Sequence, residues 1–85
     1  MNHSENIFPL TELKQFQWAK IFKIKEECPK DLRYRLLDFG FVSGTPLSVY
    51  AVSPLHAPVA YFIRGTVIVL RSEQAQYVLI KKESV

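Results

Sequence analysis

The sequence contains a single cysteine, Cys28, among its 85 residues. One cysteine cannot form a disulfide within the chain, whereas many small secreted domains depend on several disulfides for their stability. The first residues also lack the basic segment, the apolar segment and the small-residue cleavage site of a secretory signal. We therefore expect a cytoplasmic protein.

Side chains that perform chemistry near neutral pH are scarce. The two histidines, His3 and His56, lie far apart in the sequence, and no cluster of acidic residues accompanies them. A ferrous ion needs a set of ligands such as two histidines and a carboxylate, and a nucleophile needs a base close by. We therefore expect no enzymatic activity, no cofactor and no metal site.

Formal charge is absent from the stretch between Phe39 and Ile63. An apolar helix of that length could cross a membrane, but two glycines and three prolines interrupt the stretch and would leave backbone groups that lipid cannot satisfy. Within it, residues 46–52 alternate between apolar and more polar side chains, which is the period of a strand. The stretch therefore predicts strands and turns.

The length and composition limit the size of the fold. A chain of 85 residues buries only roughly 60% of the surface that its unfolded form exposes. With 48% hydrophobic and 22% charged residues, it has the composition of a globular protein. We expect a flexible tail over residues 1–8 and one domain over residues 9–82.

Periodicity and turn residues predict the order of the elements. We expect one helical turn or so within residues 9–16, helical turns at 31–39 and 72–76, and strands at 18–26, 46–52, 59–63, 67–71 and 77–81. Alternation places Val59, Tyr61 and Ile63 on one face of their strand and turns Ile68 and Leu70 inward. Five short strands with one or two short helices favour an all-β fold, a small and partly open β-barrel that hides strand edges by curling.

Some local features can be predicted in more detail. The alternation slips between Ile21 and Phe22, which indicates either a bulge or a strand covered on both faces. Asp31 and Ser72 are expected to cap the helical turns that they begin. The first of these turns should then place one apolar face on the barrel, formed by Leu32, Leu36, Leu37 and Phe39.

The three glycines are expected at chain reversals. Gly40 stands where a left-handed residue would end the helix, and Phe41 can then pack back on the last turn. Gly44 should turn the chain into the strand at 46–52, and Gly65 should form a tight hairpin turn. All three glycines are thus assigned to the fold.

Taken together, these motifs resemble the ferrous iron transport protein A (FeoA) family. The resemblance rests on the segment DLRYRLLDFGFVSGTPLSVY at 31–50, on two loop prolines, and on IRGTVIVLR at 63–71. The positions that match the family's pattern are Leu37, Gly40, Gly44, Arg64, Gly65, Leu70, Arg71 and Ala75. The resemblance covers residues 10–80, nearly the whole chain.

Membership would imply an SH3-like barrel and a role as the small cytosolic component of bacterial ferrous iron uptake. The implied partner is the FeoB permease, which has a cytosolic GTP-binding portion, so contact with the membrane is expected only through the permease. The chain departs from the family at two places: Phe16 stands where a glycine is common, and His56 and Ala57 stand where Gly-Asp is common.

A surface for such a partner is predicted around the uncharged segment between Ser53 and Pro58, because exposed apolar patches commonly mark contact sites. The candidate residues are Tyr50, Pro54, Leu55, His56, Pro58, Arg33 and Arg35. The two arginines have an alternative role as the solvated face of a helix. Self-association through the same surface is a second use that it would allow.

Two other functions remain open at this stage. Small basic barrels also bind single-stranded nucleic acid by stacking bases on aromatic rings within a basic groove. Candidate rings and charges for that function are Trp18, Phe22, Tyr34, Tyr61, Lys20, Lys23 and Lys25. Because most aromatic residues fall at predicted core positions, we expect no nucleic acid partner. A stand-alone metal-sensing domain is the other alternative.

Overall fold

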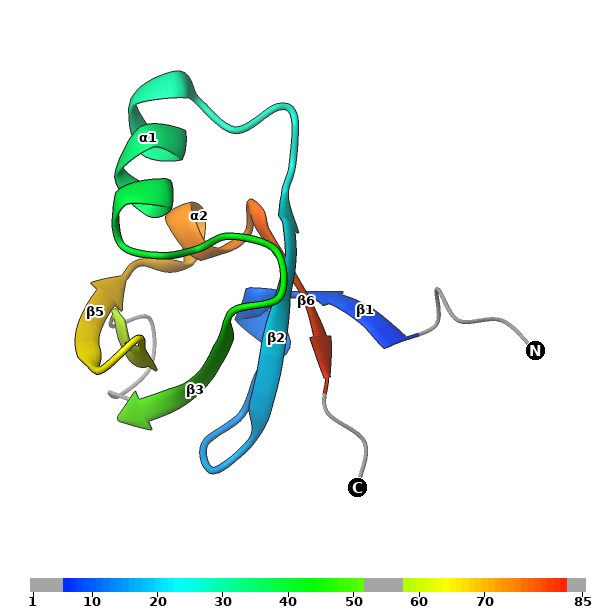
Figure 1. The fold of residues 1–85 in the computed structure, drawn as a ribbon, viewed down its shortest axis with the longest axis vertical. Helices are drawn as coiled ribbons and strands as arrows, with labels where there is room; N and C mark the ends of the chain where they lie inside the picture. Colours follow the sequence, from blue (N-terminus) through cyan, green and yellow to red (C-terminus); the bar gives the residue numbers. More distant parts are fainter. Residues whose placement is uncertain (1–5, 52–57, 83–85) are drawn as a thin grey trace.

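The computed structural model describes residues 6–51 and 58–82, and Figure 1 shows how the elements follow one another. They are β1 (Ile7–Pro9), the 3-10 helix η2 (Leu10–Glu12), β2 (Trp18–Ile24), α1 (Lys30–Asp38), β3 (Pro46–Ala51), β4 (Val59–Ile63), β5 (Thr66–Leu70), α2 (Ser72–Ala75) and β6 (Val78–Lys82). Each predicted strand and helical turn is therefore present, with ends that shift by a residue or two. No helix in these two ranges is long and apolar enough to cross a membrane.

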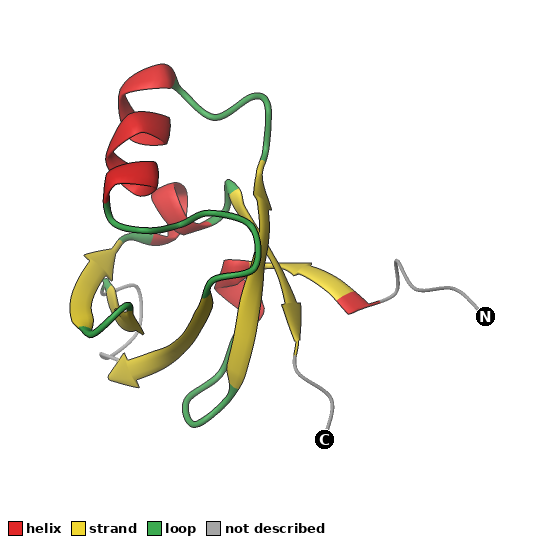
Figure 2. Cartoon of the chain, viewed as in Figure 1, coloured by secondary structure: helices red, strands yellow, loops and turns green. Residues whose placement is uncertain are grey.

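The strands form one 6-stranded antiparallel sheet in the order β1-β6-β2-β3-β4-β5. The sheet curls around one face, with α1 and α2 at the same end of the molecule (Figures 1 and 2). This arrangement confirms the prediction of an all-β fold with short helices. The curl lets a single small sheet enclose its own core.

The tail predicted over residues 1–8 is too long at its end, because Ile7 and Phe8 belong to β1. This strand pairs with β6 through Ile7 and Lys81, Phe8 and Ile80, and Pro9 and Leu79. A proline is tolerated there because an edge strand has one side without ladder hydrogen bonds. A strand of three residues is too short to show a periodicity in the sequence.

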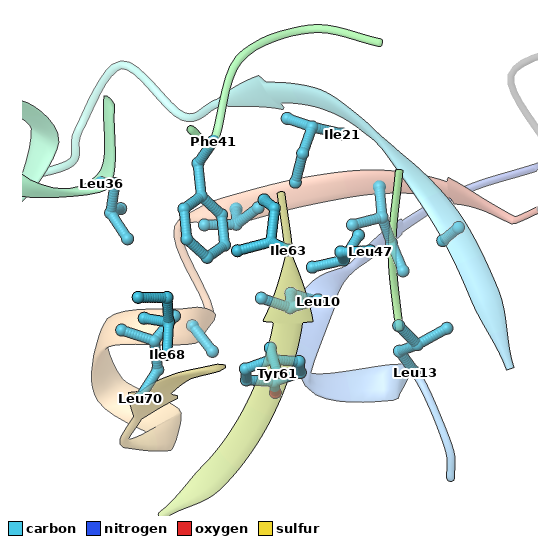
Figure 3. Packing of buried hydrophobic residues seen from close by; sticks show 14 of the residues in the cluster. Leu10, Leu13, Ile21, Leu36, Phe41, Leu47, Tyr61, Ile63, Ile68 and Leu70 are labelled. Carbon is cyan, nitrogen blue, oxygen red and sulfur yellow. The ribbon is translucent and has the colours of Figure 1, made fainter. Parts of the chain in front are cut away.

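The core lies on the concave face of the sheet, and Figure 3 shows side chains from the strands, α1 and η2 meeting there. Tyr61, Ile63, Ile68 and Leu70 face inward as the alternation predicts. The buried cluster in the described ranges consists of Leu10, Leu13, Ala19, Ile21, Ile24, Cys28, Leu36, Phe41, Leu47, Val49, Tyr61, Ile63, Ile68, Leu70, Ala75, Val78 and Ile80.

The predicted irregularity in β2 is a bulge. The pairing of β2 with β6 shifts register between Ile21 and Lys23. Ile21 and Ile24 therefore both reach the core, although three positions separate them, and Phe22 remains 38% exposed on the outer side. The bulge answers the question left open by the alternation: the strand is not covered on both faces.

α1 ends as the sequence predicts, at Gly40. The Gly40 N–H donates to the Leu37 carbonyl at 3.0 Å, and the Phe41 N–H donates to the Leu36 carbonyl at 3.0 Å. Together with the positive φ of 103° at Gly40, these bonds form a Schellman ending. Leu36 and Phe41, which this ending brings together, are both buried (Figure 3).

Other predictions about the helices are wrong. Leu37 and Phe39 are each 41% exposed, so α1 rests on the barrel through Leu36 and the partly buried Leu32 only. Asp31 lies inside α1, which Pro29 precedes without a side-chain cap. Ser72 likewise begins α2, while the Arg71 N–H donates to the Gln74 side-chain oxygen at 3.0 Å. Sequence places a capping residue only to within a position or so of the true helix start.

The side chain of Arg64 lies directly over Gly40. A Cβ atom at Gly40 would overlap the Arg64 Cδ and lie 3.2 Å from its Cγ. Arg64 and Gly65 have φ values of 52° and 76°, as a two-residue hairpin turn between Ile63 and Thr66 requires. The turn of the β4–β5 hairpin therefore packs against the end of α1.

Gly44 completes the return to the sheet. Its φ is 92°, its N–H donates to the Ile21 carbonyl at 2.7 Å, and the Ile21 N–H donates to the Thr45 carbonyl at 2.8 Å. The turn before β3 is thus held on β2 by two backbone hydrogen bonds. The prediction that Gly44 leads into a strand is confirmed.

Replacing Gly40 by alanine should destabilise the protein by about 2–4 kcal/mol, because the new Cβ would combine a left-handed backbone with overlap on Arg64. Gly44→Ala is the matched control, since φ is also positive there but the space around it is open. We expect it to cost about 1–2 kcal/mol. Urea unfolding midpoints measure both. When Arg64 is also replaced by alanine, Gly40→Ala and Gly44→Ala should destabilise the protein equally. Equal destabilisation with Arg64 in place would contradict the packing argument.

Tyr61 should make the folded state less stable at alkaline pH. Its side chain is 2% exposed, and burial raises its pKa from 10.0 to about 12. Because the unfolded chain releases this proton first, the contribution of Tyr61 is intact below pH 10 and is lost as the pH rises toward 12, by at most about 2–3 kcal/mol. Tyr61→Phe should remove this part of the decline, whereas Tyr34→Phe should not. A decline of the same size in both variants would show that Tyr61 is not its source.

Candidate functional site

The predicted partner residues fall into two separate places. Tyr50 near the end of β3 and Pro58 just before β4 border the segment that holds Pro54, Leu55 and His56, and these three residues lie outside the described part of the chain. Arg33 and Arg35 lie on α1, at the opposite end of the molecule from the tip of β3 (Figure 1). One compact surface therefore cannot contain both Tyr50 and the two arginines.

Arg33 has a structural contact of its own. Its guanidinium donates a hydrogen bond of 2.6 Å to the Lys25 carbonyl, and the residue is half-buried. This bond ties the middle of α1 to the segment that follows β2. Arg35 is exposed in the last turn of α1, where a positive charge favours the helix dipole. Both arginines thus have roles in the fold that need no partner.

Tyr50 stands out from β3 because of a second bulge. Val49 pairs with Tyr61 and Ala51 pairs with Ala60, so Tyr50 is an extra residue between the two pairs. It is 61% exposed. Simple alternation along β3 would place Ala51 on the same face as Val49, but the bulge shifts the alternation by one residue. Bulges recur next to functional sites, where they redirect a side chain.

A row of residues across the outer side of the sheet was missed by the sequence reasoning. In register, Trp18 lies opposite Ser48, Ser48 opposite Phe62, and Phe62 opposite Val67. Trp18 is 50% exposed and Val67 41%. On the same side lie Val69, 59% exposed, and Tyr50.

We call the group of Trp18, Tyr50, Phe62, Val67 and Val69 the outer apolar face. The alternation contained the signal for it: once Tyr61, Ile63, Ile68 and Leu70 face inward, the residues between them must face outward. The β strands thus have apolar residues on both sides. On the outer side Trp18, Tyr50, Val67 and Val69 are at least 41% exposed, whereas Phe62 is half-buried and Ser48, between Trp18 and Phe62, is buried.

In the part of the chain that the structure describes, side chains that could bind a metal ion do not cluster. Among residues 6–51 and 58–82 there is no group of three or more His, Cys, Asp or Glu side chains that could hold one. Both histidines, His3 and His56, lie outside these ranges.

Cys28, the single cysteine of the chain, is a buried free thiol. It is 5% exposed, and its thiol faces the Pro29 carbonyl at 3.5 Å. Burial raises the pKa of the thiol, and the nearby Arg33 guanidinium lowers it by less. A thiol of this kind is mostly protonated near neutral pH and reacts slowly.

The motif residues are largely explained by the fold. Leu70 and Ala75 are in the core, and the Arg71 carbonyl accepts hydrogen bonds from the N–H groups of Gln74 and Ala75. With the roles of Gly40, Gly44, Arg64 and Gly65 described above, the motif shapes the helix end, two turns and the start of α2. Leu37 contributes its carbonyl to the helix end, and its side chain is partly exposed.

The aromatic residues considered for nucleic acid stacking are less buried than the periodicity predicts. Tyr61 is in the core, but Trp18, Phe22 and Tyr34 are 50%, 38% and 64% exposed. Trp18 and Phe22 share the outer side of β2, and Tyr34 lies on α1. The argument that core positions leave no rings for binding is therefore wrong for these three residues.

Comparison with known proteins places the chain in a family. The family profile described as the FeoA domain matches residues 8–82. The comparison with curated proteins found no match. Among solved structures, the FeoA protein from Chlorobium tepidum has a TM-score of 0.80 at 27% identity, over 91% of this chain and 71% of that chain.

Two further structures extend the comparison. FeoA of Stenotrophomonas maltophilia complexed with zinc, described as a prokaryotic SH3 domain protein, has a TM-score of 0.78 at 25% identity, over 89% of this chain and 95% of that chain. IdeR of T. acidophilum has a TM-score of 0.78 at 19% identity, over 91% of this chain but only 34% of that chain. The second likeness shows the shared fold alone.

The burial of Cys28 predicts that its thiol reacts slowly. In the folded protein, an aromatic disulfide reagent such as Ellman's should modify Cys28 at least about 100-fold more slowly than in urea, because the thiol must first become exposed and ionised. Absorbance of the released thiolate measures both rates. Similar rates in the folded and unfolded protein would show that Cys28 is accessible, and a nucleophilic role would have to be reconsidered.

Proposed function

Because the chain belongs to the FeoA family of ferrous iron transport proteins, we propose that it is a small, non-catalytic component that modulates a FeoB-type ferrous iron permease. It acts in the cytoplasm by binding the cytosolic GTPase portion of the permease. The observation that carries this proposal is the outer apolar face, which leaves large apolar side chains uncovered on an otherwise well-packed domain.

The outer apolar face has the composition of a protein contact site. Trp and Tyr are enriched among the residues that dominate binding energy, and Trp18 and Tyr50 are here 50% and 61% exposed. Val67 and Val69 add β-branched side chains on the edge strand β5. The strands carry no acidic residue, so the face can approach an apolar patch on a partner without desolvating a carboxylate.

The mechanism that fits such a surface is a population shift. A binding module without chemistry of its own changes a partner's activity only if it binds one conformation of that partner more tightly than another. A GTPase changes conformation between its nucleotide states. The protein would therefore favour the nucleotide state whose surface best matches the outer apolar face, and iron would remain the cargo of the permease.

Co-purification with the soluble GTPase portion of the cognate permease, with and without bound nucleotide, tests the proposal. Tyr50→Asp and Val69→Asp should each weaken the complex about tenfold or more, since each buries a new charge in the contact. Tyr34→Asp is the matched control, because Tyr34 is equally exposed, at 64%, but lies on α1. It should leave the complex unchanged.

The same variants separate the two candidate surfaces. If Tyr34→Asp breaks the complex while Tyr50→Asp and Val69→Asp do not, the contact lies on α1 with Arg33 and Arg35. If none of the proteins, including the native one, is retained in any nucleotide state, the proposed partner is wrong.

A further inference from the structure

Phe16 has an unusual backbone for its residue type. In the described ranges only two non-glycine residues have positive φ, Phe16 at 70° and Arg64 at 52°. The conformation of Arg64 is explained by the hairpin turn and by its packing over Gly40. Phe16 makes no comparable contribution to the fold, because it lies outside the buried cluster and is 88% exposed.

The turn around Phe16 favours glycine at that position. The Gln17 N–H donates to the Lys14 carbonyl at 3.0 Å, and the Lys14 N–H donates to the Gln17 side-chain oxygen at 2.8 Å. In a four-residue turn of this kind, the third residue with positive φ is normally glycine or asparagine. An aromatic residue costs stability there and gains no packing, so the strain points to a function.

Basic and aromatic residues surround this turn. Register places Lys82 beside Ala19 and Lys81 beside Lys20, so the end of β6 lies next to the start of β2. Figure 1 shows the turn projecting beyond the start of β2, and the pairing of Trp18 with Ser48 places it on the side of β2 along which β3 runs toward Tyr50. The turn itself contributes Lys14, and Trp18 follows it at the start of β2.

Among the described residues, the charge around the turn is mostly positive. The charged residues of the six described strands are all lysines: Lys20, Lys23, Lys81 and Lys82. Glu12, in η2, is the one described acidic residue before β2. The other described acids lie between Glu26 and Asp38 or in α2, at the end of the molecule where the helices lie (Figure 1).

We propose that this end of the protein docks on the surface of an anionic lipid bilayer. Phe16 inserts its ring at the level of the headgroups, Trp18 lies beside it, and Lys14 and Lys81 lie over the anionic headgroups. Aromatic residues favour this interface, and clustered lysines bind anionic leaflets. A single ring projecting from a tight turn matches a fluid surface, which can open around it, better than a rigid partner, which would need a preformed pocket.

The inference goes beyond the proposed function and does not depend on it. The family resemblance implies contact with the membrane only through the permease, whereas the turn would provide a direct contact. Lipid vesicles that contain no permease therefore test the direct contact, and the outcome says nothing about binding to the GTPase portion.

Trp18 provides the readout, because it is the only tryptophan in the chain. We expect vesicles of phosphatidylcholine mixed with phosphatidylglycerol to shift its emission to shorter wavelength and to carry the protein with them on flotation. The protein should bind pure phosphatidylcholine vesicles at least about tenfold more weakly. Added salt should weaken its binding to the mixed vesicles.

Phe16→Gly is the decisive variant, because glycine suits the positive φ and the fold should be retained or stabilised. Its affinity for the mixed vesicles should fall about tenfold through loss of the buried ring. Tyr34→Ala, which removes an exposed ring from α1, should bind as the native protein does. Unchanged binding by Phe16→Gly, with thermal unfolding showing a folded protein, would overturn the proposal.

Charge variants test the other half of the contact. The double variant Lys14→Gln and Lys81→Gln should bind mixed vesicles about tenfold more weakly, whereas the matched pair Lys30→Gln and Arg35→Gln on α1 should not. Equal effects of the two pairs would mean that net charge alone is responsible and would overturn the assigned surface. Binding to a single-stranded oligonucleotide without binding to the mixed vesicles would likewise overturn the proposal in favour of nucleic acid.

Discussion

The contact between the Arg64 side chain and Gly40 joins the two halves of this small domain. It presses the turn of the β4–β5 hairpin against the end of α1. Both partners depend on backbone conformations with positive φ, one at a helix end and one in a hairpin turn. The same helix end brings Phe41 back beside Leu36 in the core. A domain of this size has few such connections, so this contact constrains much of the rest.

The small size of the core decides where function can lie. The inward side chains of a single curled sheet, with a few from α1, α2 and η2, fill the interior of the described structure. Every buried side-chain nitrogen or oxygen in the described ranges has a hydrogen-bond partner. The interior is therefore occupied by packing, and the surface carries the features that packing does not explain: the outer apolar face and the turn at Phe16.

These two features meet at Trp18, at the start of β2. If the turn holds the protein at the bilayer while the outer apolar face binds the cytosolic portion of a permease, the two contacts support each other. Binding to the membrane confines the protein near its partner and raises the effective concentration for the second contact. Neither contact would then need to be strong alone, which suits a component that has to respond to changes in its partner.

Sequence alone determined the order of elements, the inward residues of β4 and β5 and the helix stop at Gly40, because local periodicity and glycine positions carry that information. The family resemblance came from the motifs of the chain. It failed at the bulge at Tyr50, at the short strand β1, and at the helix face, where Leu37 and Phe39 are exposed. These depend on register and on neighbours distant in sequence, which periodicity cannot supply. Only the tertiary structure decided that Arg64 covers Gly40 and that the outer row is continuous across four strands, because both result from packing between segments distant in sequence. It also decided that Phe16 has positive φ, because an aromatic residue gives no sign of that backbone conformation.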